Sequence, residues 1–290
     1  MRTIAVAGGT GTVGSALVKE LVRGGRNVRV LTRNLEAAKS ALKLEAVEFA
    51  RVDFDAPDTL AAALQGADSA FFSMATSPRQ VRDEKALIDA AVKAQVPWVV
   101  NLSVGGAGSG FPNNVLDWHA EIDRYLAGSG LRHTLLRPAT FADTVFRVAS
   151  GFLPHGLWGG TAGTGRARFI DTRDVADVAA AVLTQGAPLH AGQTYDLVGP
   201  DALSMDDMAG LLSRGLGRDV KYLHRRVEEQ RRVYESAGLP PLKVDVLLGL
   251  DDLTRQNMFA RSNDVMGEVT GRDARSLEAW VKENRARSGA

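Results

Sequence analysis

Cysteine is absent from the 290 residues of this chain, and so is a strong charge of either sign. Without a thiol the protein forms no disulfide, carries no thiol nucleophile and holds no metal through thiolate ligands. The formal net charge of +1 at pH 7 offers no electrostatic reason to expect nucleic acid or an anionic membrane surface as a partner. The five histidines are scattered without the spacing of a ligand set, so we expect no metal site.

Long hydrophobic runs are also missing from the chain. No run approaches the roughly 20 apolar residues that a membrane-spanning helix requires. The segment from Met1 to Ile4 gives way to glycines too early for a signal peptide. We therefore expect a cytoplasmic protein with no membrane partner. An oligomer is compatible with the sequence, which carries no specific signal for one.

The first half of the chain alternates regularly between short apolar runs and helical patterns. The apolar runs are continuous, which is typical of parallel strands that are buried on both faces. Strands are expected at Ile4–Ala7, Val28–Thr32, Val47–Val52, Ser69–Ser73, Trp98–Leu102 and Thr134–Arg137. Helices are expected at Val13–Arg23, Leu35–Leu44, Pro57–Gln65, Val81–Ala94 and Val115–Ala127. Repeated β-α units of this kind predict a parallel, doubly wound sheet with right-handed crossovers.

The regular alternation stops after Pro138, and a glycine-rich stretch follows it. The expected fold class is α/β, a Rossmann-type doubly wound parallel sheet with a smaller, mainly helical C-terminal subdomain. Residues 1–150 would form the nucleotide-binding sheet domain, to which residues 173–198 return with a further strand at Thr194–Val198. Residues 151–172 and 199–290 would form the smaller substrate subdomain, with a short strand near Val220–Leu223.

The turn after the first expected strand is rich in glycine. It contains Gly8, Gly9, Gly11 and Gly14, and an amphipathic helical pattern follows at once. A helix start presents unpaired N–H groups and the positive end of a dipole, both of which attract phosphate. Glycines let a pyrophosphate approach the backbone closely. An isolated match would read equally well as an ordinary tight loop, but the strand–turn–helix context favours a dinucleotide site.

The end of the second strand discriminates between cofactors. A site for NAD usually carries an acidic residue there, which binds the ribose 2′-hydroxyl. This chain instead has Thr32, Arg33 and Asn34. Arg33 can pair with a 2′-phosphate and Thr32 can add a hydroxyl, so we expect NADPH or NADP+ rather than NADH. The alternative for Arg33 is a solvated surface arginine.

With these motifs in view, the chain resembles the NmrA-like group of atypical short-chain dehydrogenases/reductases. The resemblance covers nearly the whole length, and its motifs are the Gly8-x-x-Gly11-x-x-Gly14 turn, Thr32–Asn34, Gly130–Pro138, Phe169–Asp171 with Asp174–Ala176, and Thr270–Arg272. It implies a reductase that uses NADPH, similar to quinone and triphenylmethane-dye reductases. The group also includes members that bind the cofactor as redox sensors without turnover.

Catalytic members of the wider superfamily carry a Tyr-x-x-x-Lys pair on the helix after the fifth strand, but the chain has none. Val115 aligns with the tyrosine and His119 with the lysine, which puts the usual proton relay in doubt. The helical pattern turns His119 inward. His119 could therefore touch the nicotinamide ribose or the substrate and donate a proton, with Asp123 orienting or charging its imidazole. The alternative is a buried histidine that is satisfied by a backbone carbonyl.

The remaining candidates follow from the rule that ligands bind at the carboxyl ends of parallel strands. Asp53 could accept a hydrogen bond from the adenine amine, or could equally be a helix cap or a surface acid. The expected cofactor contacts are Gly8, Thr10, Gly11, Thr12, Val13, Gly14, Thr32, Arg33, Asp53, Phe54, Ser73, Met74, Ala75, Ser103, His119 and Pro138. The expected substrate-pocket residues are Thr140, Phe141, Phe152 and Trp158, although the same aromatic side chains could simply pack the junction between subdomains.

These features favour an NADPH-dependent reductase that transfers hydride to a hydrophobic, quinone- or enone-like small molecule. The candidate catalytic residue is His119. The alternative function is a non-catalytic, NADP(H)-binding redox sensor or regulator, which the missing tyrosine favours.

Overall fold

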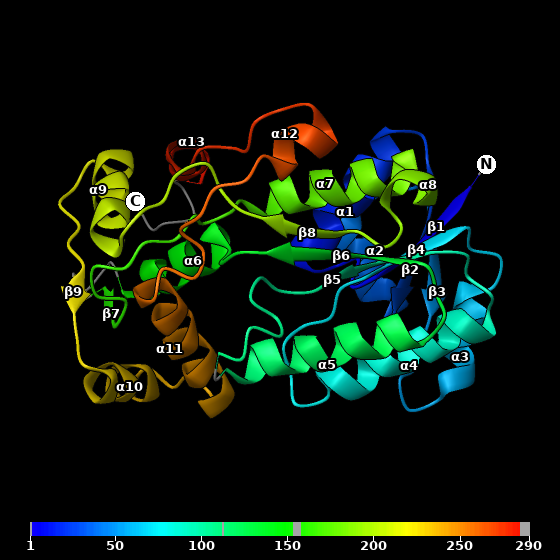
Figure 1. Cartoon of the computed structure of the whole chain (residues 1–290), viewed down its shortest axis with the longest axis horizontal. Coiled ribbons are helices and arrows are strands. Elements are labelled where there is room, and N and C mark those ends of the chain that lie inside the picture. The colour runs from blue at the N-terminus through cyan, green and yellow to red at the C-terminus, as the bar shows by residue number, and fades with distance from the viewer. Residues whose placement is uncertain (1, 112, 153–157, 285–290) are drawn as a thin grey trace. The chain divides into compact units, whose positions relative to one another are not determined.

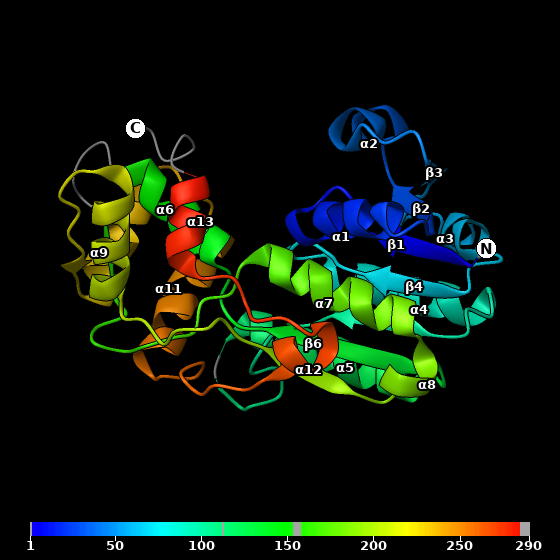
Figure 2. The same cartoon turned by 90° about the horizontal axis from the view of Figure 1, so that it is seen from above.

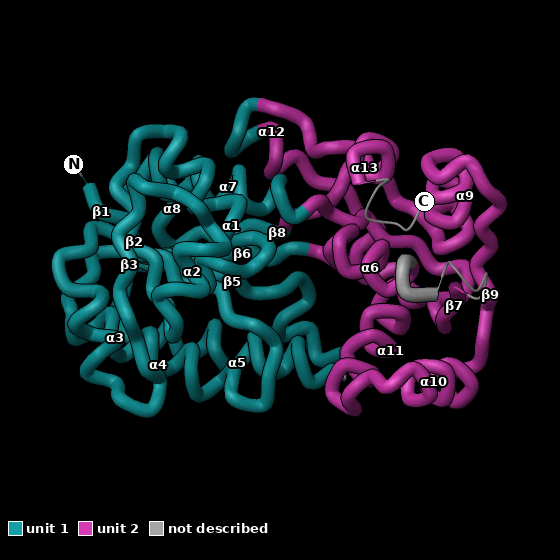
Figure 3. Tube along the Cα trace, turned by 180° about the vertical axis from the view of Figure 1, so that it is seen from behind, with its two compact units in different colours: residues 1–138, 172–196, 268–271 teal, residues 139–171, 197–267, 272–290 magenta. Residues whose placement is uncertain are grey.

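The computed structural model describes residues 2–111, 113–152 and 158–284, and it leaves the side chains of residues 150–152 undescribed. The chain divides into two compact units (Figure 3). Unit 1 consists of residues 1–138, 172–196 and 268–271, and unit 2 of residues 139–171, 197–267 and 272–290. Figure 1 gives the order of the elements along the chain.

Unit 1 is built on a sheet that has seven strands within the described residues, in the order β3-β2-β1-β4-β5-β6-β8. The strands are β1 Thr3–Ala7, β2 Asn27–Thr32, β3 Val47–Arg51, β4 Ser69–Phe72, β5 Val99–Leu102, β6 His133–Pro138 and β8 Thr194–Leu197. The pairs from β3 across to β6 are all parallel. The strand order reverses between β1 and β4, so the carboxyl ends of these two strands flank the topological switch point where such sheets bind ligands.

Helices cover both faces of this sheet, as Figures 1 and 2 show. α1 packs against α7 on one side, while α4 lies between α3 and α5 on the other. Their bounds are α1 Thr12–Arg23, α2 Leu35–Leu42, α3 Pro57–Leu64, α4 Gln80–Lys93, α5 Asn114–Gly128, α7 Thr172–Gln185 and α8 Ala187–His190. The sheet is buried between these layers, and Phe71 and Phe72 of β4 are among the largest fully buried side chains.

The expected α/β class and doubly wound sheet are confirmed, and each expected strand or helix of the first half lies within a few residues of its predicted bounds. The match has a local cause at several helix starts. Asn34 caps α2 by accepting from the Ala37 amide, and Asn113 caps α5 by accepting from the Val115 and Leu116 amides. The spacing of apolar residues also specifies the helices. In α1, for example, Leu17 and Leu21 lie on one buried face.

Unit 2 is mainly helical. Its helices are α6 Ala142–Phe152, α9 Met205–Leu216, α10 Val227–Ser236, α11 Pro241–Arg255 and α13 Leu277–Glu283, and α12 Val265–Thr270 runs from unit 2 into unit 1. β7 Gly159–Gly160 and β9 Leu223–His224 form a short parallel pair. The rings of Phe146 and Trp280 stack at 4.5 Å between centroids, which ties α6 to the C-terminal helix.

The bounds of the units differ from the expected domain limits in two places. Unit 2 begins at Ala139, directly after β6, rather than near residue 151. Residues 268–271 belong to unit 1, where the Gln185 side chain donates to the Val269 carbonyl at 3.0 Å. Neither boundary could be predicted from hydrophobic periodicity, because both depend on contacts between segments that are far apart in the chain.

Within the described residues, none of the helices has the combination of length and apolar character that crossing a bilayer requires.

Candidate functional site: a dinucleotide cradle in unit 1

The turn between β1 and α1 is shaped so that side chains do not fit at its key positions. Gly8 has φ +78°, and a Cβ there would lie 2.0 Å from the Ser73 carbonyl oxygen. A Cβ on Gly14 would lie 2.2 Å from the Gly8 carbonyl oxygen. The Gly11 amide donates to that same Gly8 oxygen at 2.9 Å. The turn is therefore held tightly against the end of β4, and only glycine satisfies this geometry at positions 8 and 14.

The opening of α1 is free of negative charge. Gly11 is its N-cap, with extended backbone and no side-chain cap, and no acidic residue lies in the first turn among the described residues. The backbone amides of Thr12, Val13 and Gly14 begin the helix, so its positive end points into the turn. Val13 is buried in the core and can contribute only its amide. This arrangement suits a pyrophosphate.

The segment after β2 places Arg33 at the surface. Arg33 is exposed, and it makes no ion pair within the described part of the chain. The Thr32 hydroxyl accepts from the Asn34 amide at 3.1 Å, and Asn34 caps α2. Thr32 and Asn34 thus shape the turn and leave the guanidinium of Arg33 available for a phosphate.

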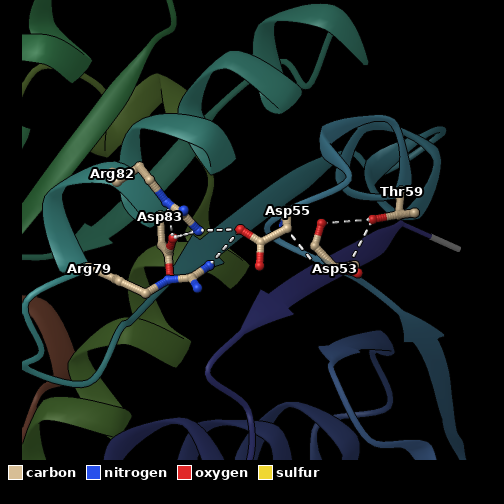
Figure 4. Close-up of polar contacts among 6 residues, drawn as sticks. All are labelled: Asp53, Asp55, Thr59, Arg79, Arg82 and Asp83. Carbon is tan, nitrogen blue, oxygen red and sulfur yellow. Dashed lines mark hydrogen bonds and ion pairs between the residues drawn. The ribbon is translucent and has the colours of Figure 1, made fainter.

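The loop after β3 holds Asp53 in a network of local hydrogen bonds (Figure 4). Asp53 accepts from the Asp55 amide through Oδ1 at 2.9 Å, and its own amide donates to the Thr59 hydroxyl at 2.8 Å. The Asp53 side chain therefore forms an Asx turn ahead of α3. It does not cap that helix, whose N-cap is Ala56 without a side-chain hydrogen bond. The carboxylate is nevertheless exposed, so one of its oxygens stays accessible to a ligand.

Asp55 connects this loop to the start of α4. Its Oδ1 pairs with Arg79 and with Arg82, each at 2.9 Å, and Arg82 also pairs with Asp83 at 2.9 Å (Figure 4). The two arginines and Asp55 are about half exposed, whereas the Asp83 side chain is 10% exposed. The network therefore fixes the β3–α3 loop against α4 and orders one edge of the candidate site.

The other expected contacts lie at the ends of β4, β5 and β6. Ser73 and Met74 are partly buried and Ala75 is exposed. Phe54 and Met74 pack against the core of unit 1, so their side chains have a structural role as well. Pro138 is buried, and its carbonyl accepts from the Gly105 amide at 2.8 Å.

His119 is buried, with 7% of its surface exposed. Its Nε2 lies 3.1 Å from the Gln80 side-chain nitrogen, and its Nδ1 has no partner among the described residues. Burial, together with the positive charge of Arg137, lowers the pKa of His119 to about 4. The imidazole is therefore neutral at pH 7. Within the described residues only its Nε2 has a partner, which is a side-chain amide and not the backbone carbonyl of the alternative interpretation.

The expected partnership between Asp123 and His119 is not found. Asp123 instead accepts from the Ser103 hydroxyl at 2.8 Å and from Arg137 at 2.8 Å. Burial raises the pKa of Asp123 despite these two bonds. The reason is geometric. Ser103, just after β5, and Arg137 of β6 both reach Asp123, and the helical pattern of α5 alone does not reveal them.

A group of buried polar residues in unit 1 was not predicted from the sequence. Gln80 and Glu84 on α4 and Asn101 on β5 are each 1% exposed. The Gln80 amide donates to Glu84 at 2.9 Å, and burial raises the pKa of Glu84 to about 7. A signal exists in retrospect, since Gln80 and Glu84 stand on the same helical stripe as the buried Leu87 and Ile88.

The candidate substrate residues belong to unit 2. Thr140 and Trp158 line a cavity there. Phe141 is partly buried and bridges to Ile170. The side chain of Phe152 lies outside the described residues. In the described ranges no group of histidine and acidic residues could hold a metal ion.

The fold and the glycine turn define a Rossmann-type, nucleotide-binding protein. The chain belongs to the NmrA-like family, whose profile matches residues 1–240. It is 33% identical over 287 residues to an NAD(P)H azoreductase of Xenophilus azovorans, and the match covers 99% of each chain. It is 28% identical over 251 residues to quinone oxidoreductase 2 of Escherichia coli strain K12, with 86% of each chain covered.

A solved structure supports the same placement. The NADPH-dependent quinone oxidoreductase of Escherichia coli, complexed with NADPH, superposes with a TM-score of 0.89 and 25% sequence identity. The match covers 97% of this chain and 99% of that one.

Proposed function

We propose that this protein is an NADPH-dependent reductase that passes hydride to a hydrophobic, quinone- or enone-like small molecule. The observation that carries the proposal is the start of α1, which has neither a side-chain cap nor an acid and sits behind a turn that only glycines fit. The named activities of the relatives, an NAD(P)H azoreductase and a quinone oxidoreductase, support the reductase class.

The cofactor is NADPH or NADP+, as expected from the sequence. The backbone amides that open α1 would hold its pyrophosphate. Arg33 would hold the 2′-phosphate, because no acidic residue stands at the end of β2 to bind a free 2′-hydroxyl. Ser73, Met74 and Ala75, which follow β4 beside the turn, are proposed to line the rest of the nucleotide. When bound, the cofactor supplies the hydride.

The protein's own contribution is binding, orientation and exclusion of water. His119 is a neutral imidazole at pH 7 rather than an imidazolium, and a neutral imidazole is a poor general acid. We therefore assign the proton that completes the reduction to water. His119 is proposed to contact the nicotinamide ribose or the substrate through its unpartnered Nδ1.

A kinetic experiment tests this function directly. Purified protein is mixed with NADPH and with quinones, cyclic enones and azo compounds in turn, and the loss of absorbance at 340 nm is followed. Substrate-dependent oxidation of NADPH is expected, with NADH being a poorer donor. If no compound is reduced while NADPH and NADP+ bind equally well, the proposal fails and the alternative of a cofactor-sensing regulator takes its place.

A further inference from the structure

We infer that the cavity of unit 2 is a binding site for one neutral, flat ring that bears a carbonyl group, and that the Tyr222 hydroxyl is its hydrogen-bond donor. That this ring is the substrate of the reductase rests on the proposed function. The existence of the site rests only on the residues that line the cavity.

The walls of the cavity are largely apolar and aromatic. Trp158 and Tyr222 meet edge to face with their ring centroids 5.0 Å apart, and Phe169 and Leu247 contribute further apolar surface. Trp158 and Phe169 are almost completely buried, so their rings are held in place by packing. Rigid aromatic walls of this kind favour a flat, apolar ligand.

Two hydroxyl groups among these walls have no partner. Tyr222 and Thr140 are each 6% exposed, and neither the Tyr222 hydroxyl nor the Thr140 Oγ1 finds a hydrogen-bond partner within the described residues. A buried hydroxyl without a partner is unfavourable, because it has lost its hydrogen bond to water and gained none. A ligand that presents an acceptor oxygen would satisfy such a group, so the cavity favours a carbonyl compound over a plain hydrocarbon.

The negative charge of Asp251 affects which ligands the cavity favours. Its Oδ2 accepts from the Thr161 amide at 2.6 Å and from the Thr161 hydroxyl at 3.2 Å. Burial raises the pKa of Asp251 to about 6, so the carboxylate is mainly ionised at pH 7. An anionic ligand would therefore be repelled, whereas a neutral carbonyl would not.

The carboxylate of Asp251 and the phenol of Tyr222 both lie beside Gly160. A Cβ on Gly160 would lie 2.3 Å from the Tyr222 hydroxyl and 2.4 Å from Asp251 Oδ2. Burial and, after it, the nearby Asp251 charge raise the pKa of Tyr222 far above its ordinary value. The phenol consequently keeps its proton over the whole neutral range and remains a donor.

Binding is tested by calorimetry on the full chain without NADPH. The probe is 2,6-dimethyl-1,4-benzoquinone, which meets no thiol in this cysteine-free protein. m-Xylene has the same methyl pattern without carbonyls, and 3,5-dimethylbenzoate carries a negative charge. The quinone should bind at least about tenfold more tightly than either of them, which corresponds to one neutral hydrogen bond at the upper end of its range.

Tyr222→Phe should weaken quinone binding about tenfold and leave m-xylene binding unchanged. The fold should survive, because the hydroxyl removed has no partner, and an unchanged melting temperature checks this. Tyr125→Phe, which removes an exposed hydroxyl from α5 in unit 1, is the matched control and should bind like the parent. Equal quinone affinity in the parent and Tyr222→Phe, or no binding to the parent, overturns the proposal.

The same variants separate this inference from the proposed function. If the quinone binds through Tyr222 but NADPH is not oxidised, the site stands and the reductase does not. If NADPH is oxidised with kcat/KM unaffected by Tyr222→Phe, the reductase stands and the substrate binds elsewhere.

Discussion

The side-chain nitrogen of Gln80 lies 3.1 Å from Nε2 of His119 and joins α4 to α5 inside unit 1. The same nitrogen donates to Glu84 Oε1 at 2.9 Å. Burial lowers the pKa of His119 to about 4 and raises that of Glu84 to about 7. Between these two values both side chains are neutral in the folded protein, which is the least unfavourable state for buried groups.

The pKa shifts of Glu84 and His119 have opposite effects on how the free energy of unfolding depends on pH. The contribution of Glu84 is fully present below its unfolded pKa and is lost as pH rises through about 7. The contribution of His119 is present above its unfolded pKa and is lost as pH falls through about 4. Their slopes should therefore largely cancel between about pH 4.5 and 6.5.

Glu84→Gln should stabilise the protein at pH 8 by up to about 3 kcal/mol, because it removes a buried charge and keeps the acceptor for Gln80. The gain should vanish near pH 4, where Glu84 is protonated in the parent. The free energy of unfolding in urea at pH 4, 6 and 8 measures the effect. Glu45→Gln, at an exposed position, serves as the control. A gain in stability that is the same at all three pH values would contradict this account of Glu84.

Two glycines of the cradle should respond differently to alanine. A Cβ on Gly14 would clash with the Gly8 carbonyl at 2.2 Å, whereas one on Gly11 would meet only that oxygen, at 3.2 Å. Gly14→Ala should lower the free energy of unfolding by about 2 kcal/mol and abolish NADPH binding. Gly11→Ala should fold nearly as well and still bind NADPH more weakly, because a methyl group would stand where the pyrophosphate approaches.

Thermal melts measure the stability of the two glycine variants, and calorimetric titration measures their affinity for NADPH. The separation of folding from binding is the informative result. Normal NADPH affinity in Gly11→Ala would show that the phosphate does not approach the start of α1.

Arg33→Ala should weaken NADPH binding about tenfold or more and leave NADH binding nearly unchanged, because only NADPH carries the 2′-phosphate. The raised NADPH dissociation constant should depend less on salt than that of the parent. Arg26→Ala, also at an exposed position after α1, should change neither constant. Equal losses of affinity for NADPH and NADH would mean that Arg33 does not bind the 2′-phosphate.

Asp53 can be tested by separating its charge from its turn-forming hydrogen bond. Asp53→Asn keeps an oxygen that accepts from the Asp55 amide, whereas Asp53→Ala removes it. Asp53→Ala should therefore lose about 1 kcal/mol of stability and bind NADPH about fivefold more weakly. Asp53→Asn should retain most of both, since an amide oxygen also accepts from the adenine amine. If Asp53 only shapes the turn, Asp53→Ala would change the melting temperature and not the NADPH affinity.

Much of the cradle could be predicted because its determinants are local. Gly8, Gly11 and Gly14 stand at fixed offsets from one strand and one helix, and Arg33 stands at the end of the next strand. Their positions follow from backbone conformation, apolar periodicity and the rule that ligands bind at the carboxyl ends of parallel strands.

The environment of His119 could not be predicted in the same way. Periodicity placed its ring on the buried face of α5, but the neighbour it meets is Gln80, 39 positions earlier in the chain. Asp123, one turn further along α5, is engaged by Ser103 and Arg137 instead. A hydrogen bond between side chains of different elements depends on how those elements pack, and spacing along one helix does not encode it.

Sequence alone therefore determined the class of this protein: a parallel β-α sheet whose first turn suits a phosphate and whose second strand ends on an arginine instead of an acid. The tertiary structure alone decided the chemistry of the buried groups, namely a neutral His119, a Glu84 that titrates near neutrality and, in unit 2, the unpartnered hydroxyl of Tyr222 and the buried carboxylate of Asp251. The physical reason is that backbone conformation and apolar period are properties of neighbouring residues. Desolvation and hydrogen-bond partnership arise only when distant segments pack together.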